Sequence, residues 1–325
     1  MPVIHFQGRA FYQLADETVL ECLLRQGESV ACACRSGVCQ TCLMRADSPD
    51  GLPAMAQQGL KEGQRLRGYF LPCICRGNDD LTIIESDRDN YCRVTVTSKS
   101  HLSPTVVRLQ LQPQQEFPFR AGQFVRVRRP DGVERSYSLS SLPGDGPLEL
   151  HVRQVPGGEM SGWIAGTLQV GDAVEISEAC GECCYSADDR MQPLLLVATG
   201  TGLAPLLGVV RDALAQHHQG PIKLFHGAAS QQDLYLLDEL KALQARAANV
   251  DYFPCVSDGV SADGEFRQGR VGDVALNELP TLQGWRVYLS GNPAMVQEMK
   301  MKAYLAGASL QHIHADPFVS ASRPM

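Results

Sequence analysis

Positive charge is scarce in this sequence. Its 29 Lys and Arg residues are outnumbered by 36 Asp and Glu residues, so the formal net charge is −7. Nucleic-acid binding requires clustered basic side chains that neutralise phosphates, and no segment of the chain supplies such a cluster. We therefore expect proteins and small molecules as partners, and no nucleic acid.

Long apolar runs are missing as well. No stretch approaches the roughly 18 consecutive apolar residues that a membrane span needs. The opening residues, MPVIHF, lack the basic segment and apolar run of a secretory signal. These two absences predict a cytoplasmic protein with no membrane-spanning segment.

The chain does have enough apolar sequence for several cores, and it has much cysteine. Its 325 residues are 44% hydrophobic, which suits two or three domains. Twelve cysteines without a secretion signal favour metal or redox chemistry over disulfides. Most of them stand singly in apolar contexts, as Cys22, Cys92 and Cys255 do, and are predicted to be small buried side chains.

One group of cysteines has a diagnostic spacing. A [2Fe-2S] cluster of the plant type is held by C-x4-C-x2-C and a fourth cysteine some tens of residues later. The sequence supplies this pattern with Cys34, Cys39, Cys42 and then the pair Cys73 and Cys75. Zinc is the alternative occupant, but it usually prefers two matched C-x2-C pairs, and the second pair here is C-x-C. The spacing therefore favours an iron-sulfur cluster.

Residues 1–88 are predicted to form the domain around this cluster. Hydrophobic periodicity orders its elements as hairpin, helix, cysteine loop and strands, at residues 3–6, 11–14, 16–26, 43–46 and 81–85. With the loop Cys34-Arg-Ser-Gly-Val-Cys39, this order resembles a plant-type ferredoxin domain, which has a β-grasp fold. In that family an aromatic and aliphatic run precedes the fourth ligand. The match to Tyr69-Phe-Leu-Pro implies Cys73 as that ligand, with Cys75 as the alternative.

Residues 89–188 read as a second domain. Short alternating strands separated by proline and glycine predict an antiparallel barrel. A flavin dinucleotide needs a cation at its pyrophosphate, a flat aromatic and a small hydroxyl near its reactive nitrogen, and Arg135, Tyr137 and Ser138 resemble that set. The stretch resembles the R-x-Y-S/T signature of the ferredoxin–NADP reductase superfamily; an ordinary strand with alternating polar residues is the alternative. The resemblance implies FAD, held by Arg135, Tyr137, Ser138, Val152, Arg153, Gly158, Met160 and Ser161.

One loop departs from that superfamily. Where many relatives have Gly-Pro-x-Gly-x-Phe, residues 178–185 read Glu-Ala-Cys-Gly-Glu-Cys-Cys-Tyr. The three close cysteines, Cys180, Cys183 and Cys184, leave a second metal or redox site open as an alternative. How this loop holds the adenine end of the flavin is not given by the pattern.

Residues 189–325 are predicted to form a third domain, on a parallel sheet. The apolar run 194–198 is typical of a strand buried on both faces, and it leads into a glycine turn and a helix, an arrangement that binds nucleotides. The turn resembles the superfamily's G-T/G-G-x-x-P motif, and residues 285–296 resemble its second motif, in which Ser290 replaces a cysteine. The resemblance implies a dinucleotide held by Thr199, Gly200, Thr201, Gly202, Pro205, Gly291 and Asn292.

Two further features concern the reaction. Residues 227–233, after the second strand of the third domain, contain no Arg or Lys for the extra phosphate of NADPH, so NADH is favoured. The tail 313–318 resembles relatives whose terminal aromatic lies close to the flavin, with simple packing as the alternative for Phe318. The implied catalytic residues are Ser138, Ser290 and Phe318.

Taken together, the chain resembles single-chain reductases that serve bacterial Rieske dioxygenases and soluble multicomponent monooxygenases. The resemblance implies a multidomain α+β and α/β protein with a β-grasp domain, an antiparallel flavin-binding barrel and a parallel-sheet nucleotide domain. It implies a monomer that passes electrons from NADH through FAD and a [2Fe-2S] cluster to an acceptor protein such as an oxygenase. The alternatives are a reductase of a deoxysugar-type or small-molecule acceptor, and an electron carrier with a decayed nucleotide site.

Overall fold

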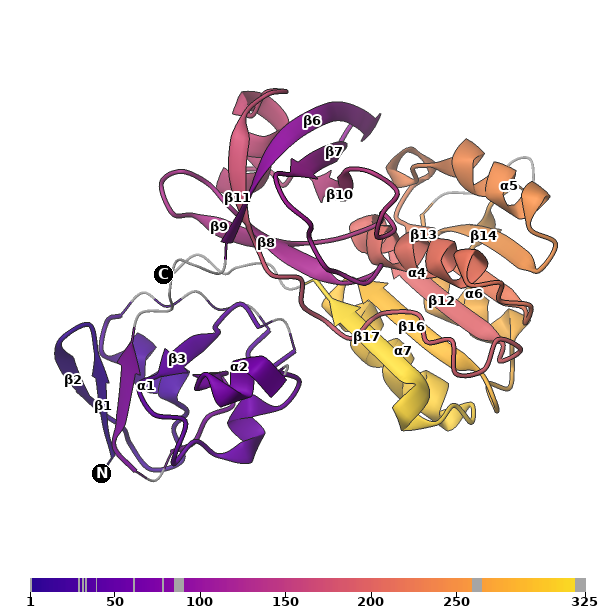
Figure 1. Ribbon diagram of the computed structural model, residues 1–325. Helices are drawn as coiled ribbons and strands as arrows, with labels where there is room; N and C mark the ends of the chain where they lie inside the picture. The colour runs from indigo at the N-terminus through magenta and orange to yellow at the C-terminus, as the bar shows by residue number, and fades with distance from the viewer. Residues whose placement is uncertain are drawn as a thin grey trace. The chain divides into compact units, whose positions relative to one another are not determined.

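The computed structural model describes residues 2–28, 30, 32, 34–38, 40–60, 62–77, 79–84, 91–258 and 265–318. They belong to two compact units (Figure 1). The first consists of the described residues up to Ile84, and the second of Tyr91–Phe318. The predicted boundary at 88/89 lies outside the described residues.

The first unit is a five-stranded mixed sheet with short helices, as the β-grasp expectation requires. Its strand order is β2-β1-β5-β3-β4, with β1 and β5 parallel. Helix α1 begins at Val19 rather than at Asp16, because Thr18 and Glu21 form a capping box. The elements are β1 (Val3–Phe6), β2 (Arg9–Tyr12), α1 (Val19–Arg25), β3 (Met44–Ala46), η1 (Ala54–Gln57), α2 (Glu62–Leu66), β4 (Tyr69–Phe70) and β5 (Leu81–Ile84).

The second unit begins with a six-stranded antiparallel sheet in the order β10-β7-β6-β11-β8-β9. A bridge between Leu139 and Leu150 joins the two edges and closes the sheet into a barrel. Alternate residues point inward to a core that includes Val94, Leu109 and Val125. The elements are β6 (Tyr91–Ser103), β7 (Val106–Pro113), β8 (Phe124–Arg128), β9 (Glu134–Ser138), β10 (Leu148–Arg153), α3 (Glu159–Gly162), the π-helix η3 (Trp163–Thr167) and β11 (Ala173–Ser177).

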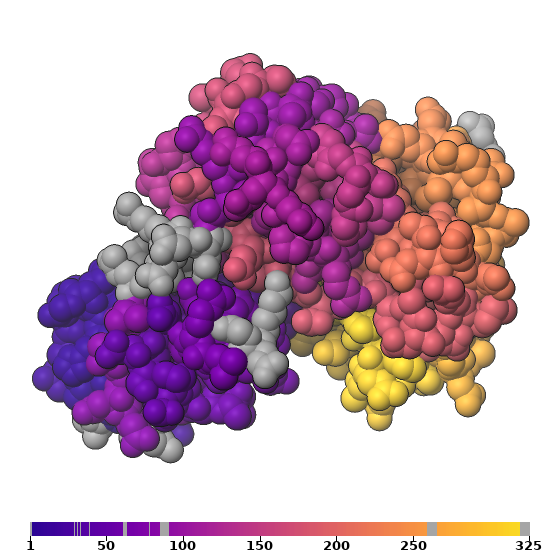
Figure 2. Space-filling model, in the orientation of Figure 1, coloured from indigo at the N-terminus to yellow at the C-terminus, as the bar shows by residue number. Residues whose placement is uncertain are grey.

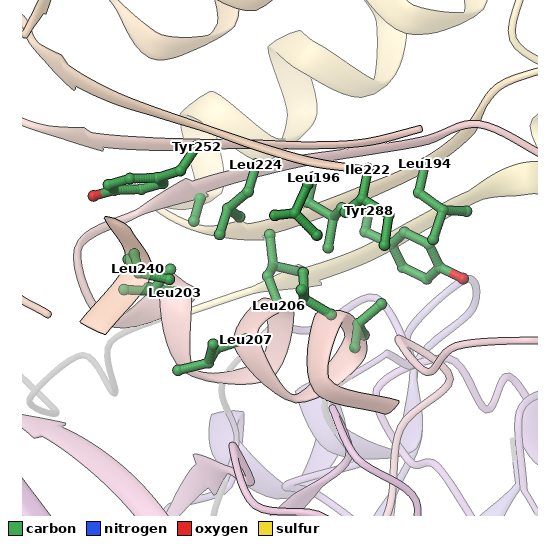
Figure 3. Close-up of a cluster of buried hydrophobic side chains, with 14 of the residues drawn as sticks. Leu194, Leu196, Leu203, Leu206, Leu207, Ile222, Leu224, Leu240, Tyr252 and Tyr288 are labelled. Carbon is green, nitrogen blue, oxygen red and sulfur yellow. The ribbon is translucent and has the colours of Figure 1, made fainter. Parts of the chain in front are cut away.

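A six-stranded parallel sheet completes this unit, in the order β15-β14-β13-β12-β16-β17. Strand β12 (Leu194–Thr199) in the middle of this sheet is buried on both faces, as predicted. Leu194 and Leu196 pack toward α4 (Figure 3), and Leu195 and Val197 pack into the hydrophobic core on the opposite face. The elements are β12 (Leu194–Thr199), η4 (Gly200–Gly202), α4 (Leu203–Ala215), β13 (Ile222–Ala228), η5 (Gln231–Asp233), α5 (Leu237–Arg246), β14 (Val250–Val256), β15 (Arg267–Gln268), α6 (Val271–Glu278), β16 (Arg286–Gly291), α7 (Pro293–Leu305), η6 (Leu310–His312) and β17 (Ile313–Pro317).

Two helices of this sheet differ from the ranges that the sequence predicts, which are 206–216 and 233–245. Helix α4 starts at Leu203, directly after the glycine turn, so Pro205 lies in its first turn, where a missing N–H costs nothing. Helix α5 starts only at Leu237, because Leu236 has a left-handed backbone with φ 59. The segment before it, with Asp233, forms a short turn capped by Ser230. The predicted boundary at 188/189 falls between β11 and β12 and stays a prediction.

A buried charged network joins the barrel to the helices of the parallel sheet. Glu149, on β10, is 8% exposed, and its Oε1 accepts hydrogen bonds from Ser140 Oγ at 2.8 Å and from Arg211 Nη1 on α4 at 3.2 Å. Arg108 Nε lies 3.5 Å from its other oxygen. Burial alone would raise the pKa of Glu149, but hydrogen bonds from His151 and Ser140 and the Arg211 charge outweigh it and lower that pKa well below its usual range. The barrel surface accordingly meets that of the parallel-sheet helices (Figure 2).

None of the helices in the described part of the chain combines the length and the apolar character needed to cross a membrane.

Candidate cofactor and dinucleotide sites

The cysteine loop of the first unit is tightly curled. Arg35, Gly37 and Gln40 all have positive φ, at 53, 80 and 52, a conformation that costs glycine least. A Cβ on Gly37 would come 2.6 Å from Cδ1 of Ile74, so the loop backbone lies against the segment that carries Cys73. Cys39 lies outside the described residues.

The two candidates for the fourth ligand lie in different surroundings. Cys73 packs with Cys42 in a small cluster beside the loop. The hydrogen bond with Cys42 lowers the pKa of the Cys73 thiol, and the Gly37 N–H adds to this effect against burial. Cys75 packs instead in the main core of the unit with Cys22, and burial raises its pKa to about 12. The donor set beside the loop therefore fits thiolate ligation, and Cys75 is held away from it.

The predicted flavin residues on β9 differ in exposure. Arg135 is exposed and its Nη1 donates to the Glu134 carbonyl at 2.7 Å, so its charge is available at the surface. Tyr137 packs against the barrel core, where burial raises its pKa. Ser138 is 6% exposed. The strand thus presents a cation, an aromatic ring and a hydroxyl within four consecutive positions.

The segment after β10 is a tight turn into α3. Ser161 Oγ accepts the Val155 N–H at 3.1 Å, and a Cβ on Gly158 would come 2.6 Å from that oxygen, so the turn leaves no room for a side chain at Gly158. Val152 and Met160 point into the barrel core, so these two residues can reach a cofactor only with their backbone. The exposed Arg153 lies next to Gly200 of the parallel sheet, since a Cβ there would be 3.7 Å from its Nη1.

The glycine turn lies at a reversal of strand order. From β12 the chain moves to β13, β14 and β15, and then returns to the other side of β12 as β16. In open parallel sheets, ligands bind outside the carboxyl ends of the strands at such a point. The residues predicted to hold a dinucleotide gather there, at the end of β12, on η4, in the first turn of α4 and at the end of β16.

At the reversal of strand order, the backbone segments pack so closely that Gly202 and Gly291 have no room for a side chain. A Cβ on Gly202 would lie 2.6 Å from the Gly291 nitrogen, and one on Gly291, which has φ 114, would collide with the Thr199 carbonyl. Asn292 N–H donates to Thr199 Oγ1 at 2.8 Å. The Asn292 side chain accepts from Ala294 N–H at 2.9 Å and so caps α7. The turn can therefore bring its amides close to a pyrophosphate.

Asp316, which sequence patterns did not single out, is hydrogen-bonded to two of the predicted catalytic residues. Ser138 Oγ donates to Asp316 Oδ2 at 3.0 Å, and Ser290 Oγ donates to the Asp316 carbonyl at 3.2 Å. Phe318 N–H donates to the Gly291 carbonyl at 2.7 Å. Burial raises the pKa of Asp316 to about 6. An acidic residue close to Phe318 was visible in the tail, but its partner Ser138 is 178 residues away and no pattern connects the two.

The loop 178–185, whose sequence differs from the superfamily's motif, holds buried thiols. Burial raises the pKa of Cys183, with the charge of Asp316 adding to it, and raises that of Cys184 to about 12. Tyr185 is 1% exposed and its hydroxyl lies 3.0 Å from His218 Nδ1. In the described ranges no group of three Cys, His, Asp or Glu side chains is arranged to hold a metal ion. The same is true around Cys34, Cys42 and Cys73, so this finding does not decide the alternative of a second metal site in the loop.

Comparison with known proteins agrees with this geometry. Three family models match: a 2Fe-2S iron-sulfur cluster binding domain over residues 4–77, an oxidoreductase FAD-binding domain over 93–185 and an oxidoreductase NAD-binding domain over 196–301. The chain is 34% identical over 311 residues to the ferredoxin–NAD(P)+ reductase component of the naphthalene 1,2-dioxygenase/salicylate 5-hydroxylase systems of a Ralstonia species. The match covers 93% of each chain. This chain belongs to the family of ferredoxin–NAD(P)+ reductase components.

Other relatives of this reductase component are named for other enzyme systems. This chain is 33% identical to the reductase subunit of an aromatic O-demethylase from Amycolatopsis, over 94% of this chain and 95% of that one. The crystal structure of an Amycolatopsis cytochrome P450 reductase covers 99% of the chain with a TM-score of 0.72 at 30% identity. The reductase component is an NAD(P)H-dependent flavin iron-sulfur oxidoreductase that uses a [2Fe-2S] cluster, FAD and NADH. The predicted fold class is confirmed.

Proposed function

We propose that this reductase component takes electrons from NADH and delivers them singly to the oxygenase component of a multicomponent system. The observation that carries the proposal is the similarity, over nearly the whole chain, to reductases whose names place them in such systems. When bound, FAD accepts a hydride and the cluster passes electrons one at a time. The protein's own residues have to bind these groups, orient them and exclude water.

The choice of NADH over NADPH is supported by the end of β13. The stretch after Gly227 carries no basic side chain, and the carboxylate of Asp233 accepts from Ser230 Oγ at 2.8 Å. Within residues 227–233 a 2′-phosphate would meet a negative charge and no Lys or Arg, whereas a 2′-hydroxyl can donate to a carboxylate. NADH is therefore the favoured donor.

We assign roles to the predicted site residues on the same basis. The exposed guanidinium groups of Arg135 and Arg153 supply positive charge for the FAD pyrophosphate, Tyr137 supplies a flat surface and Ser138 a hydroxyl. The close-packed turns at the strand reversal hold the NADH pyrophosphate. The cluster is ligated by Cys34, Cys39, Cys42 and Cys73. Three domains at 1–88, 89–188 and 189–325, a monomeric state and a cytoplasmic location complete the proposal.

The test uses the purified, reconstituted protein and two electron acceptors. NADH should bleach the flavin band; ferricyanide can then take electrons from the flavin, whereas cytochrome c reduction requires the cluster. Cys39→Ser should abolish NADH-dependent cytochrome c reduction and leave ferricyanide reduction largely intact. Cys92→Ser, at a single cysteine on β6, is the matched control and should retain both activities. Equal loss of both activities in Cys39→Ser contradicts the relay, and FAD that NADH cannot reduce contradicts the enzyme.

A further inference from the structure

His226, on β13, is a buried imidazole for which the assignments above provide no role. It is 0% exposed, and burial lowers its pKa to about 4, so the ring is neutral and carries a single N–H at neutral pH. Side chains two residues apart on a strand share a face, so the ring lies on the same face as Leu224. Figure 3 shows Leu224 and Tyr252 on the face of the sheet that α4 covers. The imidazole is therefore enclosed between the sheet and the elements that cover this face.

One of the two ring nitrogens has a side-chain partner. The hydroxyl of Tyr252 lies 3.3 Å from Nδ1. Burial raises the pKa of this hydroxyl, which therefore stays protonated and donates to Nδ1. That hydrogen bond places the single ring proton on Nε2. Nε2 is buried and makes no hydrogen bond of good geometry with any residue that the structure describes, so the ring has an N–H donor to spare.

The Gly200 carbonyl is the acceptor beside the ring. A backbone hydrogen bond with Gly200 raises the pKa of His226 against the effect of burial, and only an acceptor acts in that direction. Gly200 directly follows β12, in which Ala198 is the parallel partner of His226. The same carbonyl accepts the Leu203 N–H at the start of α4. Because a carbonyl oxygen has two lone pairs, it can accept from the imidazole as well.

Steric packing does not fix the peptide that follows Gly200. This residue has φ 53, and the nearest atom to its Cβ position is Arg153 Nη1 at 3.7 Å, an ordinary contact. A Cβ on Gly202, in contrast, would lie 2.6 Å from the Gly291 nitrogen. Glycine has the largest conformational freedom of all residues. A hydrogen bond to the Gly200 carbonyl therefore adds a restraint that packing leaves out.

The orientation of this carbonyl decides what the glycine turn presents to a ligand. In a trans peptide the C=O of Gly200 and the N–H of Thr201 point in opposite directions. We propose that His226 is a positioning residue for the dinucleotide: its Nε2–H holds the Gly200 carbonyl beneath the turn, so that the Thr201 N–H faces the pyrophosphate. The interaction is a hydrogen bond and transfers neither protons nor electrons. This inference rests on the proposed function, in which NADH binds at this turn.

The test separates NADH binding from hydride transfer. Stopped-flow bleaching of the flavin band in the holoprotein, at increasing NADH concentrations, gives an apparent dissociation constant and a limiting rate. His226→Phe keeps an aromatic ring but removes the N–H. It should raise the apparent dissociation constant about fivefold to tenfold, as one lost hydrogen bond does, with little change in the limiting rate. His226→Gln supplies an amide N–H at a similar reach and should restore the affinity.

Tyr252→Phe is the matched control, because it removes the hydrogen bond at the other nitrogen of the same ring. It should lower the free energy of unfolding, as His226→Phe does, but leave the affinity for NADH largely unchanged. A purely structural role of the imidazole predicts weaker NADH binding in both variants. That result, or unchanged binding in His226→Phe, overturns the proposal.

A second measurement observes the peptide itself and does not depend on turnover. Isotope labelling of glycine carbonyl carbons and threonine nitrogens selects, in nuclear magnetic resonance spectra, the amides of the Gly-Thr pairs Gly200–Thr201 and Gly166–Thr167. ADP-ribose, which contains the pyrophosphate, should shift the Thr201 signal, whereas adenosine should not. This shift should be lost in His226→Phe and return in His226→Gln, and Thr167 serves as the internal reference.

The two measurements distinguish the inference from the proposed function. No response of Thr201 to ADP-ribose in the unmodified protein, or the same response in His226→Phe, overturns the positioning role. Failure of NADH to bleach the flavin counts against the proposed function alone, because the response to ADP-ribose still tests the imidazole.

Discussion

Replacement of Gly291 by alanine should separate steric crowding at the strand reversal from backbone strain. Gly291 has φ 114, and a Cβ there would collide with the Thr199 carbonyl and lie 3.0 Å from the Thr199 nitrogen. Gly284 provides the matched control, because it has φ 82 and no atom within 4 Å of its Cβ position. Alanine with a left-handed backbone costs about 1–2 kcal/mol, and this is the whole expected cost at Gly284.

At Gly291 the crowding adds to that strain. Forcing an extra carbon into a packed region costs about 1–3 kcal/mol, so Gly291→Ala should lower the free energy of unfolding by about 2–5 kcal/mol. Urea unfolding followed by circular dichroism measures both variants. Because relief of the collision has to move the Thr199 turn, Gly291→Ala should also weaken NADH binding at least tenfold, whereas Gly284→Ala should not. Equal costs in the two variants, or unchanged NADH affinity in Gly291→Ala, would refute the reasoning.

Two other predictions concern the cluster and the buried network. Cys73→Ser should abolish the visible spectrum of the reconstituted cluster, whereas Cys75→Ser should preserve it because Cys75 belongs to the hydrophobic core; the reverse result would reassign the fourth ligand. Glu149 has a depressed pKa in the folded protein, so its contribution to stability is present above its unfolded pKa of about 4.3 and is lost as the pH falls below it. Glu149→Gln should therefore show a weaker loss of stability between about pH 5 and pH 3 in acid-titrated urea unfolding, and an unchanged slope would contradict this account.

Much of the fold could be predicted from the sequence because its signals are local. The apolar run of β12 and the glycine turn directly after it together span nine residues, and each follows from burial or backbone freedom at its own position. The order of ferredoxin, barrel and nucleotide segments was likewise visible in short motifs. The family comparisons confirm that order.

What the sequence did not show depends on tertiary contacts. The late start of α5 reflects a left-handed residue, Leu236, whose type gives no sign of that conformation. The partnership of Ser138 with Asp316 requires a barrel strand to meet the last strand of the parallel sheet. The C-x-C spacing does not distinguish Cys73 from Cys75; the resemblance implied Cys73, and the two thiols pack in different hydrophobic clusters.

The network around Glu149 limits how freely the parts of this reductase can be exchanged with those of its relatives. Its carboxylate belongs to the barrel, but the guanidinium of Arg211 that accompanies it belongs to the parallel-sheet region. A chimera that imports another nucleotide domain without an arginine at that place would leave a buried anion with fewer partners, at a cost of several kcal/mol. Engineered hybrids should therefore transfer residues 91–318 together, or replace Glu149 along with the domain.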